Sequence, residues 1–158
     1  MSFKVSPIKW EDHEKHSDDI LAAIDASRAA TGKSTLGVGG AWAGTKDLFN
    51  DNRCDALHEW LRTIVPSKPE HIDAWGVAHS VGDVLAPHDH INSQHGGVNE
   101  WAGVYFMADG TRGDGLCFEE QKPIKPAAGH AVIFPANLIH WTKPAKADRL
   151  SIAFNVRA

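Results

Sequence analysis

The N-terminal part of the chain carries two apolar patterns with the period of a helix. In the first, Ser-Asp-Asp at residues 17–19 predicts a helix start, because serine caps a first turn and acids there interact favourably with the helix dipole. Apolar residues recur after it at helical spacing, at Ile20, Ala23 and Ile24. Gly32 is a typical residue for the end of this helix.

The second helical pattern lies in DNRCDALHEWLRTIVPSKP, residues 51–69. One face of the predicted helix is lined by Cys54, Leu57, Leu61 and Ile64. Pro66 ends it, because proline lacks the N–H that a helix interior needs. The Gly-rich stretch at residues 37–51, between the two helices, predicts a loop with room for a short strand.

From about residue 70 the pattern changes to short apolar or alternating segments. They are IDAWGVAHS, VGDVLAPHDHI, EWAGVYFMA, GLCFEE, HAVIFPANLIH and RLSIAFNV. Turn-forming residues separate them roughly every 8 to 15 positions, a rhythm typical of an antiparallel β-sandwich or barrel of about six to eight strands. We therefore expect one mainly β (α+β) domain over residues 1–158. Its helical part spans about residues 1–68, its β core spans about residues 70–158, and both helices pack on the outside of one sheet.

Composition narrows the class of protein. The 158 residues are 42% hydrophobic and 23% charged, as in ordinary soluble domains, and the formal net charge of -4 argues against a nucleic-acid partner. No run approaches the ~18 apolar residues of a membrane span, and the N-terminus has no apolar core of a secretory signal. Two cysteines, Cys54 and Cys117, form no CxxC motif. We expect a cytoplasmic protein with reduced thiols and no membrane partner.

The ten histidines raise the question of a metal site, and the densest polar cluster is PHDHINSQH, residues 87–95. On a strand, His88 and His90 point to one face and Asp89 to the other. Two histidines on one face form half of a metal site, since their neutral nitrogens can converge on one ion. His140, at the end of VIFPANLIH, is the natural candidate for a third ligand.

Arg149 and Ser151 are also two residues apart, so both face one side of the last predicted strand. A guanidinium beside a hydroxyl forms a seat for a carboxylate. The alternative is an arginine paired with an internal Asp or Glu. Beside the histidines, this pair favours a small dicarboxylate that chelates the metal at one end and pairs with Arg149 at the other.

These motifs together resemble the Fe(II)/2-oxoglutarate oxygenase superfamily, and within it the small oxygenases with a His-x-His motif followed by a W-[SA]-G-V-Y strand. The matching stretches are PHDH, EWAGVYF, GLCFEE, PAAGHAVIFPANLIHWTKP, RLSIAFN and, near the N-terminus, VGGAWAGTKDLFND. They span about residues 34 to 156. The resemblance implies a double-stranded β-helix (a jelly roll, as in cupins) for the β core.

Carried over residue by residue, the resemblance makes His88 the first iron ligand and His140 the distal one. Arg149 and Ser151 would hold the distal carboxylate of 2-oxoglutarate. Tyr105 and His79 occupy places from which the family often contacts this cosubstrate.

One position departs from the family pattern of two histidines and a carboxylate. The carboxylate slot, two residues after the first histidine, holds His90. We take His90 as the second ligand, with Asp89 as the alternative if the chain bulges there.

The leading hypothesis is an Fe(II)- and 2-oxoglutarate-dependent dioxygenase that uses O2 to hydroxylate a small molecule or a peptide while 2-oxoglutarate loses CO2 to give succinate. A three-His cupin-type metalloenzyme without 2-oxoglutarate stays open, although it leaves Arg149 and Ser151 without a role. So does a non-catalytic β-sandwich that binds a carboxylate or a sugar. Trp42, Trp101 and Trp141 line either a substrate mouth or the core. A monomer and a homodimer both stay open.

Overall fold

Two helices and two antiparallel sheets make up the part of the chain that this computed structural model describes, residues 5–31, 40–92 and 98–157. The helices are α1 (His13–Thr31) and α2 (Asp55–Ile64), and short 3-10 helices span Leu48–Asn50, Asn52–Cys54 and Arg112–Asp114. The strands are β1 (Ile8–Lys9), β2 (Trp42–Ala43), β3 (His71–His79), β4 (Trp101–Phe106), β5 (Leu116–Phe118), β6 (His130–Pro135), β7 (His140–Thr142) and β8 (Arg149–Arg157). None of the described helices is both long enough and apolar enough to cross a membrane.

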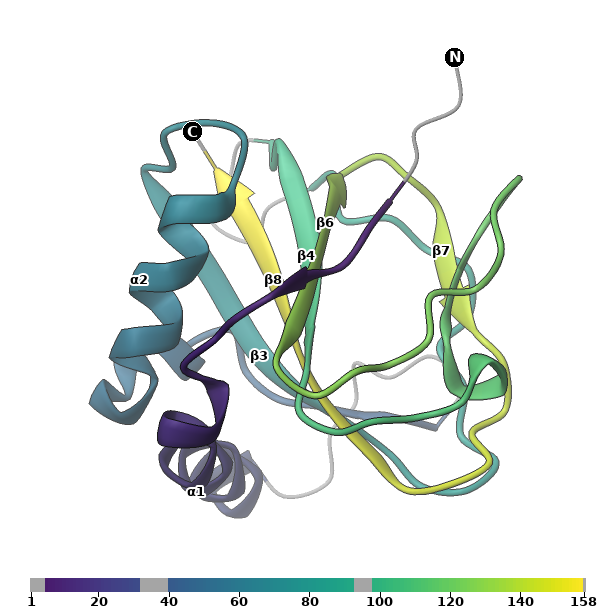
Figure 1. Cartoon of the computed structure of the whole chain (residues 1–158), viewed down its shortest axis with the longest axis horizontal. Coiled ribbons are helices and arrows are strands. Elements are labelled where there is room, and N and C mark those ends of the chain that lie inside the picture. Colours follow the sequence, from purple (N-terminus) through teal and green to yellow (C-terminus); the bar gives the residue numbers. More distant parts are fainter. Residues whose placement is uncertain (1–4, 32–39, 93–97, 158) are drawn as a thin grey trace.

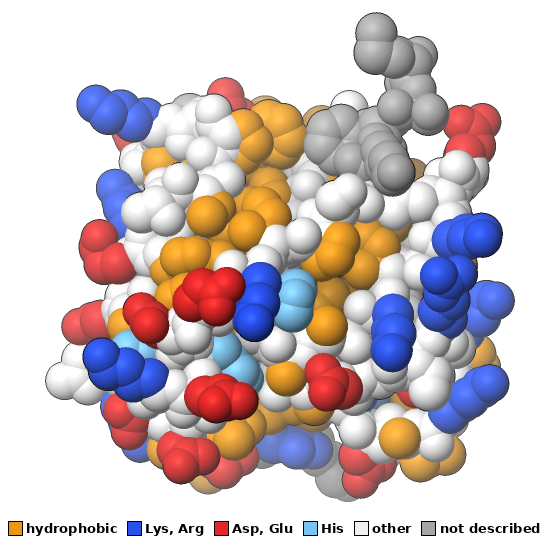
Figure 2. Space-filling model, in the orientation of Figure 1, with side chains coloured by type: hydrophobic (Ala, Val, Ile, Leu, Met, Phe, Trp, Pro, Cys, Tyr) orange, Lys and Arg blue, Asp and Glu red, His pale blue; other side chains and the backbone are white. Residues whose placement is uncertain are grey.

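The larger sheet has six strands in the order β1-β6-β4-β8-β3-β2, and the smaller sheet pairs β5 with β7. The two helices lie on one side of the larger sheet and β7 lies on the other (Figure 1). The expected mainly β architecture, with both helices covering one sheet, is confirmed. On the face shown in Figure 2, hydrophobic side chains lie near the middle, Lys and Arg gather toward the right, and most Asp and Glu lie at the left and below.

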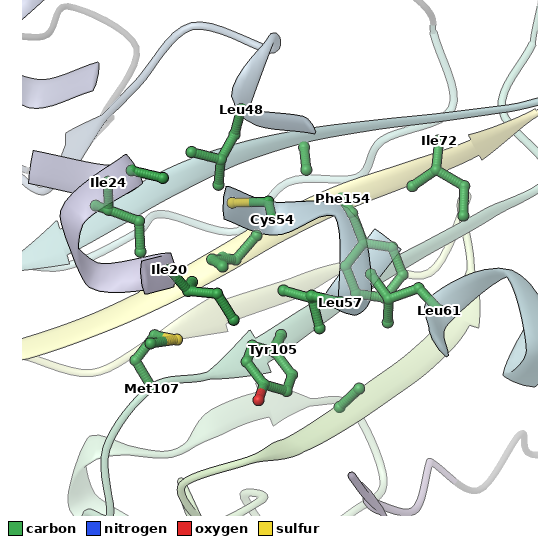
Figure 3. Close-up of a cluster of buried hydrophobic side chains, with 14 of the residues drawn as sticks. Ile20, Ile24, Leu48, Cys54, Leu57, Leu61, Ile72, Tyr105, Met107 and Phe154 are labelled. Carbon is green, nitrogen blue, oxygen red and sulfur yellow. The ribbon is translucent and has the colours of Figure 1, made fainter. Parts of the chain in front are cut away.

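The main core lies between the helices and the larger sheet (Figure 3). Ile20 and Ile24 of α1 and Leu57 and Leu61 of α2 are fully buried against the sheet. The sheet contributes alternate residues of its strands, among them Ile72, Ala74, Tyr105, Ile152, Phe154 and Val156. The intervening residues of β3 and β8 therefore face the smaller sheet.

The helix α1 begins earlier than predicted. It starts at His13, where the backbone N–H groups of His13 and Lys15 donate to the carbonyl oxygens of Trp10 and Asp12. Ser17 lies inside the helix and its hydroxyl donates to the carbonyl oxygen of Glu14, so it does not cap the first turn. The predicted end at Gly32 lies outside the described residues, as does His95.

Two predicted strands also differ. HAVIFPANLIH is two strands in different sheets, because a turn closed by Leu138 N–H and the Pro135 carbonyl separates β6 from β7. His140 therefore opens β7 of the smaller sheet. VGDVLAPHDHI forms no regular strand. It has isolated bridges at Val84 and His88 and further backbone hydrogen bonds to the segment from Ala136 to Ala145.

Candidate functional site

A cavity of about 240 Å³ lies between the two sheets, on the side of the larger sheet away from the helices. The larger sheet supplies Trp75, Val77, His79, Val104, Phe106, Arg149, Ser151, Ala153 and Asn155. The other side supplies His88, His90, Leu116, His140 and Thr142, with Asp114 nearby. The cavity combines apolar walls with a few polar groups, which is the usual composition of a small-molecule site.

The structure brings the three predicted histidines together in this cavity. The ligand nitrogens of His88, His90 and His140 all lie within 4.8 Å of one another. Reciprocal backbone hydrogen bonds of 3.0 Å join His88 to His140, and the N–H of His90 donates to the carbonyl oxygen of Ala136. The His-x-His segment is thus held against the start of β7, although it forms no regular strand.

Hydrogen bonds orient each imidazole. Nδ1 of His88 bonds to the carbonyl oxygen of Ala86 at 2.7 Å, and Nδ1 of His140 to that of Leu138 at 3.0 Å. Nδ1 of His90 bonds to Oδ1 of Asn155 at 2.9 Å. Because a carbonyl oxygen only accepts, each Nδ1 carries the proton and each Nε2 keeps a free lone pair.

The free nitrogens are spaced for a shared cation. Nε2 of His90 lies 3.2 Å from Nε2 of His140, where two lone pairs repel unless a cation lies between them. Two nitrogens each about 2.0–2.1 Å from one ion would be roughly 3.0–3.4 Å apart. Burial, followed by the neighbouring histidines, lowers the pKa of His90 to about 3, and burial followed by His88 lowers that of His140 to about 4. Both are neutral at pH 7, as metal binding requires.

Arg149 and Ser151 face the cavity from β8, and the guanidinium of Arg149 is buried without full pairing. Its Nη1 has no hydrogen-bond partner, and no carboxylate of the described residues lies within 4 Å of it. Asp114 is the nearby acid, but its oxygens accept from the N–H of Lys146 at 2.7 Å and the hydroxyl of Thr111 at 3.1 Å. Burial lowers the pKa of Arg149, with Asp114 opposing. A buried donor of this kind calls for an anion.

His79 lies beside Arg149 on the paired strand β3 and also lines the cavity. Its Nε2 lies 3.3 Å from the hydroxyl of Thr142, and its Nδ1 has no partner. Burial, followed by the charge of Arg149, lowers the pKa of His79 to about 4. A neutral imidazole is therefore available beside the guanidinium at pH 7.

Tyr105 does not reach the cavity, and the prediction that it contacts the cosubstrate is wrong. Its ring is buried on the helix side of β4, where the hydroxyl is hydrogen-bonded to Nδ1 of His13. The neighbouring residues Val104 and Phe106 line the cavity instead. The tyrosine is one position out of phase, because successive side chains of a strand point to opposite faces.

Asp89 lies at the exposed edge of the cavity and is not part of the histidine group. Its Oδ1 accepts from the backbone N–H of Ile91 at 3.3 Å. The structure thus gathers His90, rather than Asp89, with His88 and His140.

The sequence reasoning missed Lys46, Trp75, Asp114, Thr142 and Asn155 as cavity residues. Two of them carried a signal: Trp75 has the same phase as His79 on β3, and Asn155 has the same phase as Arg149 on β8. None of the three tryptophans considered for a substrate mouth lines the cavity. Trp42 lies in the main core and Trp101 packs against it, while Trp141 lies on β7.

Comparison with known proteins bears on the fold. No protein-family model and no curated protein sequence matches the chain. Solved structures do match over nearly the whole chain. A Pseudomonas putida prolyl-4-hydroxylase shares 20% identity at a TM-score of 0.69, covering 97% of this chain and 91% of its own.

Two further structures extend the comparison. The Trichoplax adhaerens prolyl hydroxylase in complex with a hypoxia inducible factor peptide fragment has 14% identity and a TM-score of 0.70, with 96% and 82% covered. The alpha-ketoglutarate-dependent carbocyclase SnoK from nogalamycin biosynthesis has 10% identity and a TM-score of 0.74, with 96% and 78% covered. At these identities the likeness concerns the fold. The chain has the fold of the Fe(II)/2-oxoglutarate oxygenases, the superfamily that its motifs resemble.

Proposed function

We propose that the protein is an Fe(II)- and 2-oxoglutarate-dependent oxygenase that hydroxylates a C–H bond of its substrate. One observation carries the proposal: a single cavity holds three histidines with converging Nε2 atoms and, apart from them, a buried guanidinium nitrogen without a partner. A metal ion would bind the three converging nitrogens, and a carboxylate would pair with the guanidinium. 2-Oxoglutarate, with a chelating end and a free carboxylate, joins the two.

In this proposal the double-stranded β-helix is formed by the two sheets, with the cavity between them. His88, His90 and His140 hold the iron, and Arg149 and Ser151 hold the distal carboxylate of 2-oxoglutarate. His79 lies beside that carboxylate as a neutral hydrogen-bonding group. Bound Fe(II) supplies the activation of O2 that hydroxylation requires, coupled to decarboxylation of 2-oxoglutarate.

The residues of the chain orient the metal ligands and exclude water from the cavity. The Nδ1 hydrogen bonds fix the direction of the three imidazoles, and the apolar walls formed by Val104, Phe106 and Leu116 limit access of water. Three neutral ligands leave the iron with more positive charge than a carboxylate-containing set would. Dianionic 2-oxoglutarate offsets that charge.

The solved structures with the same fold belong to enzymes that catalyse different reactions, so the reaction and the substrate of this protein are part of the proposal. Those compared above include hydroxylases, one in complex with a peptide, and a carbocyclase. We favour hydroxylation of a small molecule or an exposed peptide side chain, with O2 as co-reactant. The free, buried thiols of Cys54 and Cys117 agree with the cytoplasmic location that we expect.

The test is anaerobic addition of Fe(II) and then 2-oxoglutarate, followed by visible absorption. We expect a metal-to-ligand charge-transfer band. Metal binding without an effect of 2-oxoglutarate would favour the cupin-type alternative, and no metal binding would contradict both enzymes.

Arg149→Ala is expected to weaken 2-oxoglutarate binding by at least about thirtyfold, since truncating one partner of a buried charge pair costs about 2 kcal/mol or more. The charge-transfer band titrated with 2-oxoglutarate gives this affinity. Fe(II) retention serves as the control and should be unchanged, because Arg149 is not among the histidine ligands. An unchanged 2-oxoglutarate affinity would remove the proposed anchor.

His140→Ala is expected to abolish iron retention after gel filtration, measured by elemental analysis. His71→Ala is the matched control, because His71 lies at the exposed start of β3 outside the cavity. Iron retained by His140→Ala at the wild-type level would show that the ligand assignment is wrong.

A further inference from the structure

The cavity contains a second cation, Lys46, to which the arrangement of iron and cosubstrate gives no role. Lys46 is half-buried at the cavity wall, and its Nζ lies 4.9 Å from the centroid of the Trp75 ring. Within the described residues, no carboxylate comes within 4 Å of this ammonium group. An ammonium that faces a cavity without a counter-ion is suited to bind an anion.

Structured segments on both sides fix the position of Lys46. Before it, β2 pairs with β3, and the N–H of Gly44 donates to the carbonyl oxygen of Gly76 at 2.8 Å. After it, the hydroxyl of Thr45 donates to Asp47 at 2.6 Å, and the buried Leu48 anchors the following 3-10 helix. The side chain is therefore directed onto Trp75 by the fold.

The nearest buried acid, Asp73, is already engaged. One of its oxygens lies 2.5 Å from Nε2 of His71 and the other lies 3.7 Å from the guanidinium of Arg157. Burial lowers the pKa of Lys46, and the attraction to Asp73 opposes this only in part. The ammonium is thus costly to keep charged in the free protein, and a bound anion would relieve the cost.

Lys46 and Arg149 belong to different ends of the cavity. In the register of β3 and β8, Arg149 lies opposite His79 and Ala153 lies opposite Trp75. Lys46 contacts the ring of Trp75. Four residues of strand separate the two pairs, roughly 13 Å at about 3.3 Å per residue. The ring of His90 packs against Trp75 at a tilt of 37°, with ring centroids 5.6 Å apart, so the Lys46 end adjoins the histidine cluster.

We propose that Lys46, seated on Trp75, binds a carboxylate of the substrate, which is a small organic acid. The assignment rests on the proposed function, since it gives the Arg149 end to 2-oxoglutarate. The size of the cavity favours a small molecule, because about 240 Å³ must hold the cosubstrate as well. Recognition of one carboxylate by Lys46 and another by Arg149 would hold substrate and cosubstrate at separate places beside the histidines.

The test uses ligand-observed NMR on the Zn(II)-loaded protein, because zinc binds histidine sets without redox chemistry. The sample contains saturating 2-oxoglutarate and, as probe, N-acetylglycinate, with N-acetylglycinamide as the uncharged control. The methylene signals of 2-oxoglutarate report the proposed function, and the methyl signal of the probe reports the Lys46 site. We expect the acid to bind and the amide not to bind.

Lys46→Met keeps the apolar stem and removes the charge, so it should weaken probe binding by at least about tenfold. Lys46→Arg should restore binding to within about threefold, and Lys68→Met, at an exposed lysine remote from the cavity lining, should leave it unchanged. The 2-oxoglutarate signals should be unaffected in all three variants.

Three results would overturn the inference: absence of probe binding in the wild type, equal binding of acid and amide, or full binding by Lys46→Met. Loss of 2-oxoglutarate binding in Lys46→Met would place Lys46 at the cosubstrate instead and would also overturn it. Absence of 2-oxoglutarate binding in the wild type would contradict the proposed function. The probe signals are read separately, so they would still show whether Lys46 binds a carboxylate.

Discussion

At the scale of single residues, the phase of each side chain along β3 and β8 determines what it can do. Arg149, Ser151 and Asn155 face the cavity, while Ile152 and Phe154 face the helices. A shift of one residue would bury the guanidinium in the main core, which is built almost entirely from apolar side chains. The strand register that buries Ile152 and Phe154 in the core therefore also places the Arg149 guanidinium in the cavity.

The same phase explains which site residues the sequence could predict. Arg149 and Ser151 are two residues apart within an apolar run, so the sequence predicts them as a pair on one face. Asn155 has the same phase but looks like an ordinary polar residue near a strand end. Lys46 follows β2 in an irregular segment, where no period relates its side chain to the cavity. Only the folded chain brings it to Trp75.

Among the described residues, Asn155 is the one side chain that orients an imidazole of the cluster through Nδ1, since His88 and His140 use backbone carbonyls. We expect Asn155→Ala to lower metal affinity by about 10–100-fold, the usual effect of losing such a partner. Competition with a chromophoric chelator for Co(II) or Zn(II) measures this.

Asn92→Ala is the matched control for Asn155→Ala, because Asn92 is an exposed asparagine at the edge of the same cavity. Equal metal affinity of Asn155→Ala and the wild type would mean that packing against Trp75 alone orients His90.

At the scale of elements, the close approach of β4 to its neighbours depends on Gly103. A Cβ at this position would overlap the Phe154 ring and lie 2.5 Å from the carbonyl oxygen of Val132. Both obstacles belong to the core and the neighbouring strand, so they have little room to move.

Gly103→Ala is therefore expected to lower the free energy of unfolding by about 1–3 kcal/mol, the usual cost of overpacking a filled core. Urea denaturation followed by tryptophan fluorescence measures it. Gly113→Ala is the control, because its new methyl group would meet only the end of the Lys146 side chain. Similar stabilities for the two variants would contradict this account of the β4 packing.

The boundary between β6 and β7 could not be predicted from the sequence. The run HAVIFPANLIH is continuously apolar, so nothing in its pattern marks the change of sheet between β6 and β7. The turn depends on a hydrogen bond from Leu138 N–H to Pro135 and on pairing of His140 with His88, which is a long-range contact. The residue type alone marks His140 as a candidate ligand, whereas its place in the smaller sheet depends on these long-range contacts.

At the scale of the whole molecule, buried neutral histidines link stability to pH. The pKa values of His79 and His140 are lowered to about 4 and that of His90 to about 3, all below the ordinary value of 6.5. The unfolded chain binds protons at these residues first as pH falls. The stability that they contribute is therefore full above about pH 6.5 and is lost between about pH 6.5 and 3.

The metal-free protein should accordingly have a lower melting temperature at pH 5 than at pH 7.5, measured by calorimetry in a chelating buffer. The difference should become smaller in His79→Gln, which removes one of the titrating groups. A melting temperature that is constant over this range would mean that these imidazoles are solvated in the folded state.

The alternation of side chains between the two faces of β3 and β8 has a consequence for how the sequence of such a protein evolves. The odd-numbered positions from 75 to 79 and from 149 to 155 face the cavity, while the even-numbered ones pack toward the helices. Mutations that remodel ligand preference and mutations that threaten folding thus fall on different residues of the same strands. Trp75 and Ala153 can drift toward new substrates while Ala74 and Phe154 stay fixed. Homologous proteins with this sheet can therefore change substrate specificity without destabilising the hydrophobic core.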